Sequence, residues 1–90
     1  MEVRWSGSAE KHGVIRPQVW FVIENPEASL EIEGKPGEVT RVFVGHPNEV
    51  DLGDADRLEV IVAMKPGLYF EIFHVNRLTD KFRYLVTEED

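Results

Sequence analysis

The residues best suited to chemistry are three histidines and a group of carboxylates near the middle of the chain. His12, His46 and His74 are 34 and 28 positions apart, so none share the close spacing that gives one strand two metal ligands. His46, in a Gly-His-Pro-Asn turn, is a candidate for a binding surface, but no partner for general-base chemistry stands beside it. His74 is expected to be a partly buried strand residue hydrogen-bonded to backbone. Alternation places it on one strand face with Leu68, Phe70 and Ile72.

The densest group of carboxylates surrounds Gly53. The EF-hand calcium loop needs a glutamate at the position where this chain has Val62, so the spacing does not predict such a site. A solvated acidic loop is the simpler expectation, and such a loop can contact a partner protein. The candidate partner-binding residues are therefore Glu49, Asp51, Asp54, Asp56, Glu59 and His46.

Motifs for covalent catalysis and phosphate binding are missing. The chain has no cysteine, and its three serines (Ser6, Ser8 and Ser29) stand outside any Gly-x-Ser-x-Gly elbow. Gly34–Gly37 has the bare Gly-x-x-Gly form of a nucleic-acid clamp, but its flanks resemble strands rather than helices. We therefore predict a protein that is not an enzyme and uses no cofactor or metal. A small metal-dependent hydrolase built on His46, His74 and the 51–56 loop remains an alternative.

Charge is distributed unevenly along the chain. The formal net charge is −7, and the segment from Glu24 to Glu59 holds ten carboxylates against three basic residues. An acidic surface repels nucleic acid and accelerates encounter with a basic protein. The predicted function is a non-enzymatic protein-interaction module with a protein partner, possibly a basic one. A small phage-type inhibitor that occludes the basic nucleic-acid-binding site of its target is an alternative.

The rest of the sequence indicates one β-rich domain over residues 1–90. Val is three times as frequent as Ala, and Gly and Pro are spread along the chain, as in folds made of short strands and turns. About seven short segments spaced like strands favour an all-β, immunoglobulin-like sandwich of antiparallel strands. The expected strands are Val3–Trp5, Val14–Glu24, Leu30–Glu33, Val39–Val44, Leu58–Met64, Leu68–Val75 and Phe82–Val86.

Two segments are ambiguous between strand and helix. Asp54 could cap a helix over residues 54–65, but the β-branched run Val60–Val62 favours a strand. Phe82, Leu85 and Val86 also have helical spacing, although Glu88–Asp90 puts negative charge at the wrong end of such a helix. A small barrel, or an α+β domain with a helix near 54–65, is the alternative fold. Without an apolar leader or membrane span, a cytoplasmic location is expected, and a homodimer is possible.

Overall fold

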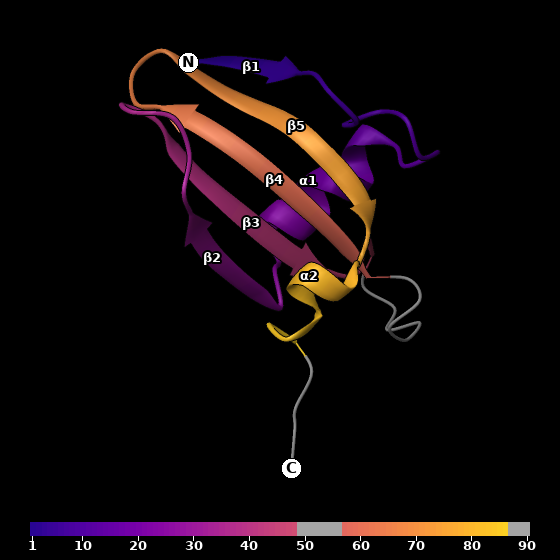
Figure 1. The fold of residues 1–90 in the computed structure, drawn as a ribbon. Helices are drawn as coiled ribbons and strands as arrows, with labels where there is room; N and C mark the ends of the chain where they lie inside the picture. The colour runs from indigo at the N-terminus through magenta and orange to yellow at the C-terminus, as the bar shows by residue number, and fades with distance from the viewer. Residues whose placement is uncertain (49–56, 87–90) are drawn as a thin grey trace.

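One curved five-stranded sheet forms the body of the protein (Figure 1). A computed structural model describes residues 1–48 and 57–86. The strand order across the sheet is β1-β5-β4-β3-β2. The elements in chain order are β1 (Glu2–Trp5), α1 (Arg16–Glu24), β2 (Ala28–Ile32), β3 (Val39–Gly45), β4 (Leu58–Lys65), β5 (Tyr69–Arg77) and α2 (Asp80–Arg83).

The sheet is mixed rather than fully antiparallel. Strands β2 to β5 pair antiparallel with their neighbours, whereas β1 adds to the edge of β5 in parallel. The prediction of a β-rich domain is confirmed, and strands occur at five of the seven expected places. The described residues form one sheet instead of the two of an immunoglobulin-like sandwich, and a helix covers one face where a second sheet was expected.

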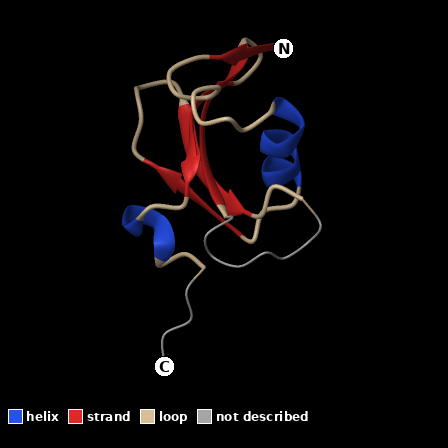
Figure 2. Ribbon diagram, turned by 90° about the vertical axis from the view of Figure 1, so that its right-hand side faces the viewer, coloured by secondary structure: helices blue, strands red, loops and turns tan. Residues whose placement is uncertain are grey.

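The two helices lie on opposite faces of the sheet (Figure 2). The α1 side holds the larger core, in which Val19 and Val22 of the helix pack against the fully buried Val60, Ile72 and Val75. The opposite face holds a smaller core. There Leu78 and Phe82 cover Val42 and Val44. The end of this face next to the β2–β3 and β4–β5 turns is left uncovered by α2 (Figure 1).

The segment Val14–Glu24 is a helix, so the prediction of a strand there was wrong. Pro17 fits the first turn of a helix, because the backbone N–H that proline lacks has no helical partner at that position. The Gln18 side chain accepts a hydrogen bond from the Ile15 N–H at 3.1 Å, closing the N-terminus. Val19 and Val22 are three residues apart and lie on the buried face. Burial of that face outweighs the strand preference of the β-branched residues.

Two Lys-Pro-Gly turns join the antiparallel strands. In the first, the Glu38 N–H donates to the Lys35 carbonyl at 3.1 Å, and Gly37 has a φ of 82°. This is the type II turn predicted from the sequence, since that turn needs a positive φ at its third position. The β4–β5 turn repeats the arrangement, with Gly67 at a φ of 80°.

The chain after β5 differs from the predicted final strand. It forms α2 and a following turn, in which Phe82 is buried and Leu85 and Val86 pack on the same core. These three residues have the helical spacing noted above, which brings their side chains to one side of the segment. The segment Leu58–Met64 is a strand, as preferred over the helix alternative.

Candidate functional site

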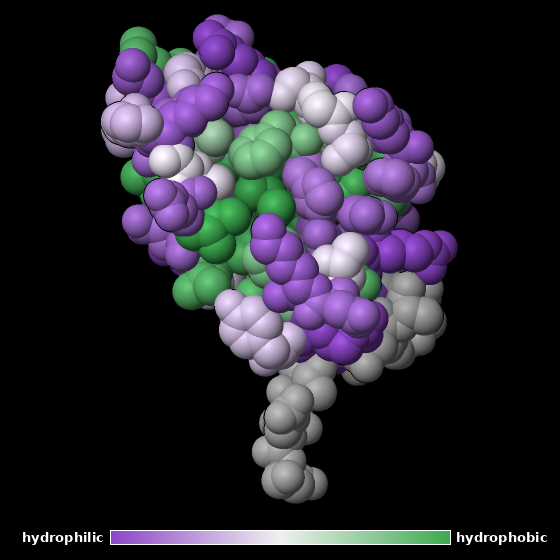
Figure 3. Space-filling model, viewed as in Figure 1, coloured by the Kyte–Doolittle hydropathy of each residue, from purple (hydrophilic) through white to green (hydrophobic). Residues whose placement is uncertain are grey.

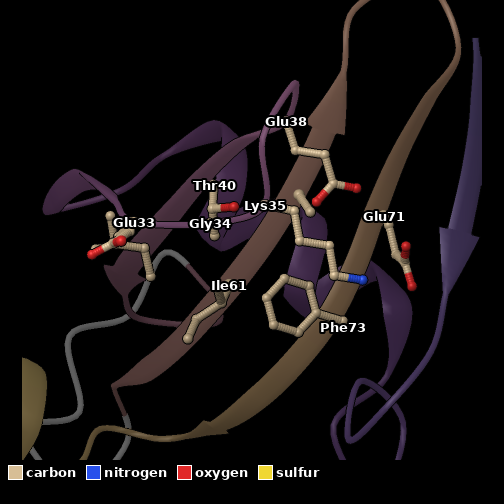
Figure 4. A pocket seen from close by; sticks show the side chains of 10 residues that line it. Glu33, Gly34, Lys35, Glu38, Thr40, Ile61, Glu71 and Phe73 are labelled. Carbon is tan, nitrogen blue, oxygen red and sulfur yellow. The ribbon is translucent and has the colours of Figure 1, made fainter.

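The open part of the sheet face contains an apolar pocket of about 660 Å³. Its floor consists of side chains from the four strands β2 to β5, and the connection between β2 and β3 forms one wall. Figure 3 shows this face, with an apolar patch near its centre surrounded by hydrophilic residues. The lining residues, most of which Figure 4 labels, are Ile32, Glu33, Gly34, Lys35, Glu38, Thr40, Ile61, Ala63, Glu71 and Phe73.

A β-bulge in β5 brings two consecutive side chains to this face. Ile61 pairs with His74 while Val62 pairs with Ile72, so Phe73 is an extra residue in its strand. Ile72 is buried on the α1 side, Phe73 lines the pocket, and His74 contacts Glu59 on the open face. Simple alternation predicted His74 on the same face as Ile72, and this prediction was wrong because the bulge shifts the pattern by one residue.

The wall between β2 and β3 lies close against the sheet because Gly34 has no side chain. A Cβ at this glycine would stand 2.0 Å from the Thr40 hydroxyl, a separation that two atoms cannot occupy. The chain can therefore pass directly over Thr40 and bring Lys35 and Glu38 to the mouth of the pocket. In Figure 4 the Lys35 side chain extends across the mouth toward Glu71.

Three carboxylates surround the pocket, from Glu33, Glu38 and Glu71. The Tyr69 hydroxyl donates a hydrogen bond to Glu38, and the Ser6 hydroxyl donates one to Glu71. The hydrogen bond to Glu38 raises the pKa of Tyr69 above its ordinary value, because the carboxylate stabilises the protonated phenol. These neutral donors orient the carboxylates without neutralising their charge.

Within residues 1–48 and 57–86, none of these three carboxylates forms an ion pair. Other carboxylates do so readily: Glu2 contacts Arg4 at 2.8 Å, and Glu10 contacts Arg16 at 2.8 Å. Each arginine lowers the pKa of its glutamate, mainly through the hydrogen bond between them. The pocket carboxylates differ from these pairs: Lys35 lines the same pocket and Arg4 attracts Glu71, but within the described residues neither cation forms an ion pair with them.

Beside the pocket, four polar side chains are connected by hydrogen bonds. Glu59 lies on β4 and His74 on β5, Ser8 lies in the segment after β1, and Thr79 precedes α2. His74 Nε2 lies 2.8 Å from Glu59 Oε2, and His74 Nδ1 lies 3.4 Å from the Ser8 hydroxyl. The other oxygen of Glu59 accepts hydrogen bonds from the Thr79 N–H at 2.7 Å and the Thr79 hydroxyl at 2.5 Å. Because Glu59 is only 2% exposed, these contacts hold a buried carboxylate.

The candidate binding residues chosen from the sequence do not form one site among the described residues. Four of them lie outside the described residues, namely Glu49, Asp51, Asp54 and Asp56. Glu59 is not the exposed loop acid that was expected, since it points from β4 into the polar chain just described. His46 is nearly buried, with Nδ1 2.7 Å from a Glu27 oxygen, and Arg57 contacts that same carboxylate at 2.9 Å.

Three residues of the pocket had separate signals in the sequence but no common one. Glu33 was expected at the end of a strand, and Gly34 and Lys35 belong to the segment considered only for its Gly-x-x-Gly spacing. Their contacts depend on pairing between β2 and β3, and no local spacing encodes how far the turn folds over the sheet. Comparison with protein-family models, curated sequences and solved structures finds no match for this chain.

Two further properties of the described part of the chain concern metals and membranes. No group of three or more potential metal ligands occurs within residues 1–48 and 57–86. Neither helix there has the length and apolar character needed to cross a bilayer.

Proposed function

We propose that this chain is a protein-interaction module that holds a basic, amphipathic segment of its partner in the pocket of the open sheet face. The volume of about 660 Å³ lies within the range of ligand-binding pockets and is large enough for one or two side chains. Ile61, Ala63 and Phe73 supply an apolar floor, which stabilises a bound apolar side chain or the aliphatic part of a long one.

The observation that carries this proposal is the unpaired charge around that floor. Glu33, Glu38 and Glu71 surround the pocket, and within the described residues none of them forms an ion pair, although Lys35 lines the same pocket and Arg4 attracts Glu71. A lysine or arginine from another protein would provide the missing positive charge while its aliphatic part covers the floor. Lys35 already extends toward Glu71 in this manner, so the pocket accommodates the chemistry that it is proposed to bind (Figure 4).

Charge also favours a different protein over a second copy of this chain as the occupant. Two copies would each carry a net charge of −7, so their approach is opposed by repulsion. A basic partner is attracted over the same distance, which raises its association rate at low salt. These charges support a basic partner for the open face, which is a different surface from the acidic loop that the sequence suggested.

A pair of peptides of opposite charge tests the proposal. Each has three leucines alternating with two charged residues: arginines in the acetylated, amidated Leu-Arg-Leu-Arg-Leu peptide and glutamates in its counterpart. We expect the arginine peptide to shift the amide resonances of Ile61, Ala63 and Phe73 in a ¹H–¹⁵N spectrum. The glutamate peptide should leave them unchanged, because it shares the apolar residues but has the opposite charge.

Two variants separate specific binding from general attraction to an acidic protein. Glu71→Gln removes a carboxylate at the pocket, whereas Glu24→Gln removes an exposed carboxylate at the end of α1, outside the pocket lining. Binding should weaken in the first and stay constant in the second. Equal shifts with both peptides, or shifts located on α1 instead of the open face, would contradict the proposal.

A further inference from the structure

We infer that Ser8 is an activated nucleophile, with His74 as its general base and Glu59 as the residue that positions His74. This goes beyond partner binding, because it assigns the protein an acyl-accepting serine. The evidence is the continuous set of contacts from the Ser8 hydroxyl through both ring nitrogens of His74 to the buried carboxylate of Glu59. A nucleophile, a base and a group that orients the base are the parts required for nucleophilic catalysis by serine.

Hydrogen bonding determines which nitrogen of His74 faces the serine as an acceptor. A carboxylate oxygen accepts hydrogen bonds, so Glu59 Oε2 at 2.8 Å places the ring proton on His74 Nε2. Nδ1 of the neutral ring then has its lone pair directed to the Ser8 hydroxyl, 3.4 Å away. This contact is long for a hydrogen bond, and catalytic contacts often shorten only when a substrate is bound.

Glu59 is itself held in place by Thr79. The Thr79 N–H and hydroxyl both donate to Glu59 Oε1, which leaves Oε2 directed to His74. Because Glu59 is buried and carries two such donors, its carboxylate has a fixed orientation. It also stabilises the positive charge that forms on His74 when that ring takes a proton.

The segment containing Ser8 is fixed to the β5 bulge. The Ser8 N–H donates to the Phe73 carbonyl at 3.1 Å, and a Cβ at the preceding Gly7 would lie 2.3 Å from that same oxygen. Gly7 also has a φ of 58°, a conformation that residues with side chains rarely adopt. The glycine therefore allows the chain to approach closely enough for Ser8 to reach His74. The His74 side chain remains 30% exposed, which leaves the pair accessible from solvent.

The proposed step is acyl transfer from an activated ester. The Ser8 oxygen forms a bond to the acyl carbon as its proton moves to His74 Nδ1, and the bond from that carbon to the alcohol oxygen of the ester breaks. The leaving group departs as phenolate when the ester is p-nitrophenyl acetate. His74 releases to solvent the proton that it gained. Water then attacks the acetylated serine and its proton passes to His74, which transfers it to the Ser8 oxygen as the bond from that oxygen to the acyl carbon breaks. The acetic acid that is released ionises to acetate and a second proton.

Reaction of the whole chain with p-nitrophenyl acetate, followed by peptide mass spectrometry, tests the assignment. We expect the acetyl group on Ser8, and Ser8→Ala should abolish labelling at this position. Ser29→Ala is the control, because Ser29 is an exposed serine on β2 whose hydroxyl accepts a hydrogen bond from Arg41 and does not contact His74. In this control variant, Ser8 should be acetylated to the same extent as in the unmodified protein.

Two further variants test the roles of His74 and Glu59. His74→Gln keeps a hydrogen-bond donor for Glu59 but removes the base, so the rate of Ser8 acetylation should fall by roughly 100-fold or more. Glu59→Gln keeps the shape of the side chain and removes its charge. The rate of acetylation should fall, and it should fall less in Glu59→Asp, which keeps the charge but not the length of the side chain; a purely structural contribution would give the opposite order.

The inference fails if Ser8 is acetylated no faster than Ser29, or if His74→Gln leaves its rate unchanged. It also fails if Glu59→Gln, shown by circular dichroism to be folded, has the rate of the unmodified protein. None of these three outcomes bears on peptide binding at the pocket, because that binding is measured without any reactive ester.

Discussion

Replacing Thr79 by Val tests the physical basis of the buried carboxylate that joins α2 to the sheet. The two side chains have the same branched shape, so the substitution removes little packing and deletes one hydroxyl donor. That hydroxyl lies 2.5 Å from Glu59 Oε1, and Glu59 is only 2% exposed. Hydrogen bonds to charged groups contribute about 1.5–3 kcal/mol to stability, and we expect a loss in that range.

Urea denaturation followed by circular dichroism measures this loss. The urea concentration at the midpoint should fall. The slope of the unfolding free energy against urea concentration should stay the same, since the surface exposed on unfolding is unchanged. In a thermal melt, the same loss lowers Tm by at least about 6 °C for a domain of this size.

Thr40→Val is the matched control. The Thr40 hydroxyl lies at the open pocket, where water can reach it, so this substitution removes no hydrogen bond within residues 1–48 and 57–86 and stability should be retained. A loss below about 0.5 kcal/mol for Thr79→Val, the level of an ordinary surface substitution, would refute the reasoning.

Two further predictions concern the core and the pH dependence of the pocket rim. Ile72→Ala should destabilise the protein by about 2–5 kcal/mol in urea denaturation, because Ile72 is fully buried, whereas Leu68→Ala at an exposed site should cost less than about 0.5 kcal/mol. In an ultraviolet absorbance titration, Tyr69 should ionise above its ordinary pKa of 10.0, and Glu38→Gln should lower its midpoint. Since the unfolded chain loses this proton first, stability should fall as the pH rises above 10.0 through the folded pKa, and Tyr69→Phe should reduce that fall.

Local sequence signals predicted the strands and turns where the chain interacts mainly with its neighbours. The spacing of short strand-like segments predicted β3, the β-branched run at Val60–Val62 predicted β4, and the spread of Gly and Pro along the chain indicated turns between strands. These features depend on side-chain shape and on glycine conformation, both of which can be inferred from a few residues at a time.

The segments that were wrong are those whose structure depends on distant contacts. Val14–Glu24 has the composition of a buried strand, but packing of Val19 and Val22 on the sheet stabilises a helix. An all-apolar run is ambiguous because it satisfies both the helical and the strand period. Pro17 is compatible with both structures, because proline occurs in edge strands and in the first turn of a helix.

The polar chain beside the pocket could not be predicted because it depends on one extra residue in β5. Without the bulge, His74 would face the opposite side of the sheet and could not meet Glu59 or Ser8. Nothing in the sequence around Phe73 marks a bulge, and Gly7 acquires its meaning only once its backbone lies against the Phe73 carbonyl. Ser8 and Glu59 are far apart in sequence, so no spacing rule could connect them.

The central claim is that unpaired carboxylates around an apolar floor bind a cationic segment. Its most direct test is the dissociation constant of the Leu-Arg-Leu-Arg-Leu peptide for the protein and for a variant with Glu33, Glu38 and Glu71 all changed to Gln. Exposed ion pairs contribute about 0.2–1 kcal/mol each and the peptide has two arginines, so the triple variant should bind roughly 2- to 30-fold more weakly. An unchanged dissociation constant, with both proteins folded, would contradict the account.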